Sequence, residues 1–216
     1  MRWTIGKIGA AAGVGFVVLN VIGNALPGSP PATDDSGAKI ASFFAHHHRA
    51  VVIGAILTGL AAPLFLALVT ALALRLRVAG EGTAAAAVFA FGTVALALGI
   101  VSDALYVSLA RIGADGNTSL AKGVYELDGF IAAKSFWFAA AAALVAGWAA
   151  RRVLVQWYAA ISLAAAVVLA VGGASLRFNG FFAPLGAMSG IAFLALLVWT
   201  LATCAFVWRE PVPVVP

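Results

Sequence analysis

Two charged side chains stand deep inside stretches that are otherwise apolar. Asp103 interrupts one stretch about two turns before its end at Ala110, and Tyr106 lies one turn further along on nearly the same helical face. Lys134 lies about ten residues into the next stretch, counted from Val124. An ionised side chain in hydrocarbon is costly unless it finds a partner. Because consecutive membrane segments joined by a short loop pack side by side, we expect Asp103 and Lys134 to meet and neutralise one another.

Further polar residues are expected at a similar depth on this and other segments: Glu126, Asp128, Asn20 and Arg177. Together they exceed what a single ion pair requires, so we predict an outward-facing polar pocket that binds a ligand. Its mixed charge would suit a small zwitterion, a lipid headgroup or a proton-coupled step. The alternative is a purely structural ion pair with hydrogen-bonded neighbours that fixes the order of the helices.

Three consecutive histidines, His46, His47 and His48, suggest a metal site at first sight. Neighbouring positions on a helix point about 100° apart, so three adjacent imidazoles cannot converge on one ion without unwinding the backbone or recruiting another chain. We therefore predict a polar helix end at the level of the lipid headgroups, with no tightly bound metal. The chain has no other histidine to supply a facing haem ligand.

Residues that could act in catalysis are few. Ser102 beside Asp103 and Ser135 beside Lys134 are weak candidates for a nucleophile with a neighbouring base, because adjacent helical positions diverge. Cys204 is the only cysteine, which excludes a Cys-x-x-Cys redox pair and a thiolate metal cage within one chain. We expect no cofactor and no enzymatic chemistry; an intramembrane enzyme or a redox subunit that binds haem or quinone is the alternative.

The elements that must position these residues are membrane-spanning helices. Hydrophobic residues make up 63% of the 216 and charged residues 10%, whereas soluble domains carry about 25% charged residues. Apolar runs of the length that a helix needs to cross a bilayer occur six times. We predict an all-α, polytopic bundle of six transmembrane helices in a single domain, with spans at about 7–26, 50–74, 83–110, 124–150, 156–175 and 182–208.

The longest join, 27–49, is expected on the outer side. Its first half is proline-rich and extended, whereas Ser36 and the acidic pair before it can cap a helix. That helix is expected to continue through Phe43 and Phe44 into the second span. It would lie at the membrane interface with aromatic anchors.

Arginine pairs in the short joins set the expected orientation. Arg75 with Arg77, and Arg151 with Arg152, stand at the ends of spans where a cytoplasmic excess of positive charge directs insertion. We therefore predict a multi-pass protein of the plasma (inner) membrane with both termini in the cytoplasm. A cleaved secretory signal in place of the first span is the alternative, although the sequence after Leu26 is a poor cleavage site.

The lipid bilayer is the main expected partner. The net charge of +5 might suggest nucleic acid, but the basic residues lie singly or in pairs at span ends and form no stripe, so we expect no nucleic-acid binding. Gly9 and Gly13 form a small-residue pair that lets a second helix approach closely, either within the chain or across a homodimer. A membrane-protein partner is also compatible with the apolar surface.

Two stretches carry a resemblance to known proteins. The segment 178–187, with its Asn179-Gly180 turn and the run Phe-Phe-Ala-Pro-Leu-Gly, and the segment 40–49 together resemble a set of small six-helix membrane proteins of actinobacteria, grouped as a domain of unknown function. The resemblance implies the six-span fold. It transfers no catalytic or ligand-binding residue.

Overall fold

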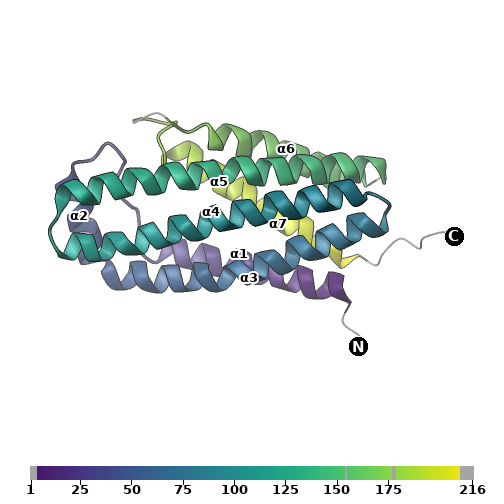
Figure 1. The fold of residues 1–216 in the computed structure, drawn as a ribbon, viewed down its shortest axis with the longest axis horizontal. Coiled ribbons are helices and arrows are strands. Elements are labelled where there is room, and N and C mark those ends of the chain that lie inside the picture. The colour runs from purple at the N-terminus through teal and green to yellow at the C-terminus, as the bar shows by residue number, and fades with distance from the viewer. Residues whose placement is uncertain (1–3, 154, 177–178, 210–216) are drawn as a thin grey trace.

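In the computed structural model the chain is described for residues 4–153, 155–176 and 179–209, and these residues form an all-α bundle (Figure 1). The helices are α1 (Ile5–Ala25), α2 (Gly37–His46), α3 (His48–Val78), α4 (Gly82–Ala114), α5 (Thr118–Arg152), α6 (Gln156–Gly173) and α7 (Ala187–Trp208). Within the described residues, all but α2 are long and apolar enough to cross a membrane. The predicted six-helix membrane bundle is thus confirmed.

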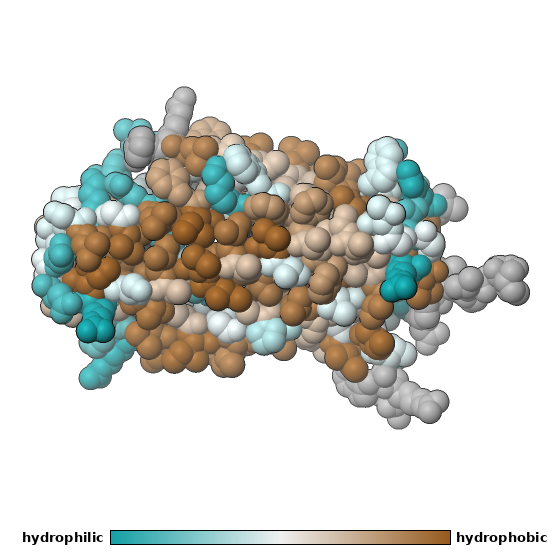
Figure 2. All heavy atoms as spheres, in the orientation of Figure 1, coloured by the Kyte–Doolittle hydropathy of each residue, from teal (hydrophilic) through white to brown (hydrophobic). Residues whose placement is uncertain are grey.

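The spans run alternately up and down the bundle. The start of α1 and the end of α7 lie at one end, here called the terminal end, together with the α3–α4 and α5–α6 joins (Figure 1). The other end, here called the α2 end, holds α2, the α4–α5 join and the α6–α7 connection. On the face seen in Figure 2, hydrophobic side chains cover the middle and hydrophilic ones gather mostly at the two ends, as a membrane protein requires.

The helices fall into two length classes. Three consecutive helices, α3, α4 and α5, have 31, 33 and 35 residues, whereas α1, α6 and α7 have 21, 18 and 22. The long helices reverse direction through tight joins. Gly80 and Gly116 take positive φ angles of 86° and 69° there, a left-handed conformation that ends helices and that glycine adopts without steric cost.

Small residues allow close packing between the helices. Gly9 and Gly13 are buried against α3, and Gly13 also meets Cys204 of α7, so this pair serves contacts within the chain. Gly23 and Gly54 mark a second close approach of α1 and α3. A Cβ atom added to Gly54 would lie 2.5 Å from the carbonyl oxygen of Gly23, and one added to Gly23 would lie 2.8 Å from that of Gly54.

Helix α2 packs into the protein. Ser36 caps its N-terminus by accepting a hydrogen bond from the backbone N–H of Lys39 at 3.3 Å, as the sequence predicts. Ile40 and Phe44 are 0% exposed and pack against α4 and α5, so Phe44 is a core residue and no lipid anchor. The helix also stops at His46, where a continuous helix into the second span was expected, and α3 begins separately at His48.

Candidate functional site

The hairpin of α4 and α5 determines which polar residues of the two helices lie at the same height along the bundle axis. Gly116 lies in the join between the two helices. Asp103 precedes Gly116 by thirteen residues, and Asp128 follows it by twelve. In two antiparallel helices with the same rise per residue, these positions lie side by side. Lys134 lies six residues beyond Asp128, about 9 Å further along α5.

The structure gathers an acidic cluster at that level, made of Ser102 and Asp103 from α4 and Asp128 from α5. Asp128 is 2% exposed, and the Ser102 hydroxyl donates a hydrogen bond to its Oδ1 atom at 2.5 Å. The Asp103 carboxylate is half-buried and interacts electrostatically with that of Asp128. Two carboxylates from neighbouring helices therefore lie at the same level among apolar segments.

The expected ion pair between Asp103 and Lys134 is not formed. Among the described residues the ion pairs are Asp35–Lys39, Glu126–Lys122 and Glu81–Arg152. The Lys134 ammonium instead lies 3.6 Å from the ring centroid of Trp137, whose indole N–H donates to the Ala170 carbonyl of α6 at 3.1 Å. The reason is the hairpin register, which puts Asp103 level with Asp128 and leaves Lys134 deeper beside α6.

Two tyrosines border the acidic cluster on the side of α2. Tyr125 is 0% exposed, and its hydroxyl donates to the Pro31 carbonyl at 2.6 Å. The ring of Phe44 packs edge-on against Tyr106 and Tyr125, with centroids 4.9 and 5.7 Å apart. Tyr125 was not among the predicted site residues, although it precedes Asp128 by three positions and so shares its helical face.

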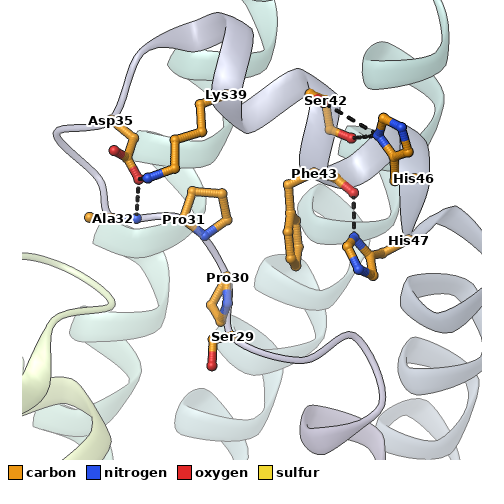
Figure 3. A pocket seen from close by; sticks show the side chains of 10 residues that line it. All are labelled: Ser29, Pro30, Pro31, Ala32, Asp35, Lys39, Ser42, Phe43, His46 and His47. Carbon is orange, nitrogen blue, oxygen red and sulfur yellow. Dashed lines mark hydrogen bonds and ion pairs between the residues drawn. The ribbon is translucent and has the colours of Figure 1, made fainter.

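A groove, here called the α2-end groove, lies beside this aromatic layer, between α2 and the loop that precedes it (Figure 3). Its volume is about 510 Å³, and its lining residues are Ser29, Pro30, Pro31, Ala32, Asp35, Lys39, Ser42, Phe43, His46 and His47. Asp35 and Lys39 form an ion pair at 2.7 Å, and Asp35 also accepts from the backbone N–H of Ala32 at 2.9 Å. These contacts hold the pKa of Asp35 below its usual value, so the pair persists into mildly acidic solution.

The three histidine side chains form hydrogen bonds with backbone carbonyls at the C-terminal end of α2. The Nδ1 atoms of His46, His47 and His48 lie 2.7, 2.9 and 3.2 Å from the carbonyl oxygens of Ser42, Phe43 and Ala45. Since a carbonyl can only accept, each Nδ1 must be the donor. These carbonyls lie at the C-terminal end of α2, and that of Phe43 also accepts from the backbone N–H of His47 at 2.9 Å. No group of three or more metal-ligating side chains occurs among the residues that the structure describes, and the absence of tight metal binding stays a prediction.

The remaining predicted site residues lie apart from the acidic cluster. Glu126 pairs with Lys122 on its own helix at 4.0 Å. The Asn20 side-chain amide donates to the Phe16 carbonyl of its own helix at 3.1 Å. Arg177 lies outside the described residues.

Comparison with known proteins gives no indication of the function. No family model matches the chain, and neither a curated protein nor a solved structure matches it. A fold alone does not imply a function, so the function must be argued from the geometry of the polar residues.

Proposed function

We propose that this multi-pass membrane protein is a small-solute binding or transport component whose acidic cluster takes up a cation from the α2 end. The cation is a proton, a monovalent metal ion or the cationic group of a small solute. The observation that carries the proposal is Asp128, which is 2% exposed, hydrogen-bonded by Ser102 and placed beside Asp103 with no basic side chain paired to it among the described residues.

Asp103 and Asp128 place two carboxylates at the same level of neighbouring helices. Two like charges at close range cannot both remain ionised without compensation, and the cost rises when they are removed from water. Lys134 does not compensate them, because it lies about 9 Å deeper and is held over Trp137. A proton shared between Asp103 and Asp128, or an incoming cation, removes this cost.

The proposed route to the cluster is a short series of polar groups that starts at the α2-end groove. The Pro31 carbonyl at the wall of the groove accepts the hydrogen bond of Tyr125, and Tyr125 lies one turn above Asp128. The ion pair of Asp35 and Lys39 gives the groove both signs of charge, which suits a zwitterion or a lipid headgroup arriving from the outer leaflet. The groove then acts as the entry and the acidic cluster as the site that selects positive charge.

The test is thermal unfolding of the purified protein in detergent between pH 5 and 9, with sodium, potassium or choline chloride added. We expect acidification or one of these cations to raise the Tm by about 2–4 °C, which corresponds to about 1 kcal/mol for a chain of this size. Asp128→Asn should abolish the response. Asp115→Asn, an exposed acid at the tip of the same hairpin, is the matched control and should retain it. An equal response in Asp128→Asn and the wild type would contradict the proposal.

We further propose that the terminal end faces the cytoplasm of a cell with a plasma (inner) membrane. In the described residues this end carries Lys7, Arg75, Arg77, Arg151, Arg152 and Arg209 against one acid, Glu81. The α2 end balances its charges, with the bases Lys39, Arg49, Arg111 and Lys122 and the acids Asp34, Asp35, Asp115 and Glu126. Such an asymmetry is typical of a positive cytoplasmic side.

A pair of reporter fusions tests this orientation. A reporter that is active only outside the cytoplasm should stay silent when fused after Glu210. The same reporter inserted into the α4–α5 join, at 115–117, should be active. The opposite pattern would invert the topology and would place the acidic cluster nearer the cytoplasm.

A further inference from the structure

A second groove lies at the terminal end, between α3 and α4, far along both helices from the acidic cluster. Its volume is about 280 Å³, and its lining residues are Thr70, Ala73, Leu74, Arg77, Gly82, Ala85, Ala86 and Phe89. Most of these are small or apolar, and Leu74, Ala86 and Phe89 are exposed at the bundle surface. The groove therefore opens to the side where lipid chains would lie.

Arg77 supplies the polar end of this groove. It is exposed, and its guanidinium forms no ion pair, hydrogen bond or aromatic stack with the described residues. The acid one turn further along, Glu81, pairs with Arg152 at 3.6 Å. The Arg77 guanidinium is thus a cation available to an outside anion.

Most other basic residues at this end are already engaged with aromatic rings. Arg75 lies 4.3 Å from the ring centroid of Phe206, and Arg209 lies 4.9 Å from that of Trp157. Lys7 and Arg152 lie over tryptophan rings in the same way. The end nevertheless keeps its surplus of positive charge, which attracts anionic headgroups towards Arg77.

We propose that the α3–α4 groove binds one anionic phospholipid of the leaflet at the terminal end, with an acyl chain along the groove and the phosphate on Arg77. The apolar walls match the chain, and the guanidinium matches the phosphate in charge and in hydrogen-bonding geometry. This site is separate from the acidic cluster, and it does not depend on the function proposed for that cluster.

Native mass spectrometry of the full chain tests the site, with phosphatidylglycerol or phosphatidylcholine added to the detergent-purified protein. The wild type should retain phosphatidylglycerol in preference to phosphatidylcholine. Arg77→Gln should lower phosphatidylglycerol retention about fivefold, the effect expected of one basic residue near a membrane surface. Ala86→Phe fills the groove without changing the charge and should lower the retention of the same lipid.

Arg151→Gln is the matched control, because Arg151 is an exposed arginine at the same end that does not line the groove. It should leave retention close to that of the wild type. An equal loss in Arg151→Gln would show diffuse attraction to the basic end and would overturn the site. A wild-type dimer that Ala86→Phe dissociates would show that a second copy covers the groove, and it would also overturn the proposal.

Discussion

Gly54→Ala is expected to lower the free energy of unfolding by about 2–3 kcal/mol, because its Cβ atom would be pushed into the backbone of α1. The added atom would lie 2.5 Å from the Gly23 carbonyl oxygen, closer than real Cβ contacts. A backbone atom cannot rotate away as a side chain can, so α1 and α3 must separate. Unfolding in mixed micelles with an increasing fraction of a denaturing detergent measures the loss.

Gly59→Ala provides the matched control on the same helix. A Cβ atom at Gly59 meets nothing within 4 Å, so the change should be neutral or should stabilise α3 by up to about 1 kcal/mol through better helix propensity. If both alanine variants were equally stable, the α1–α3 crossing would be looser than the structure shows.

Ser102→Ala should cost about 1–3 kcal/mol in the wild type and close to nothing in an Asp128→Leu background. In the wild type the change strips a buried carboxylate of its hydroxyl donor, and an unsatisfied buried acceptor costs its full desolvation penalty. Once Asp128 is leucine, no acceptor remains to be satisfied. The four proteins of this double-mutant cycle are compared by their unfolding in mixed micelles.

The second pair in this hairpin, Asp103 and Lys134, is the control for the cycle. The two residues share no contact, so the effects of Asp103→Leu and Lys134→Met should add within about 0.5 kcal/mol. Strong coupling between them, with additive effects for Ser102 and Asp128, would mean that the hairpin register differs from the one described.

The number of spans and their class follow from the sequence because apolar length alone decides whether a segment crosses a bilayer. Helix ends are harder to place. The fourth span was expected from Val124, but α5 begins at Thr118. Lys122 and Glu126 look like loop residues in isolation, yet Ala121, Tyr125 and Asp128 recur on the buried face of one continuous helix.

The misplaced start of α5 explains why Lys134 was wrongly predicted as the partner of Asp103. The sequence marks Asp103 as a residue for which a partner within the bundle is expected. Measured from Val124, Lys134 seems to lie near the level of Asp103, whereas counting outward from Gly116 in both directions places Asp128 there. The register of a tight helical hairpin was therefore the signal that could have found the acidic cluster.

Helix α2 shows a second limit of prediction from the sequence. Capping by Ser36 is local chemistry and could be read from the sequence, whereas the burial of Phe44 between Tyr106 and Tyr125 depends on where α4 and α5 end. The break at His47 depends on side chains that fold back onto the last turn, a contact that apolar periodicity does not report.

The two length classes of helix have a consequence for the surrounding bilayer. Helix α5, with 35 residues, is about 52 Å long, whereas α6, with 18 residues, is about 27 Å long. A hydrocarbon core about 30 Å thick matches α6, whereas α5 extends beyond it at the α2 end, where Lys122 and Glu126 make its surface polar. The α4–α5 hairpin therefore reaches past the hydrocarbon on the side where α2 packs against it, so the extra helix length builds a polar cap and does not stretch the bilayer.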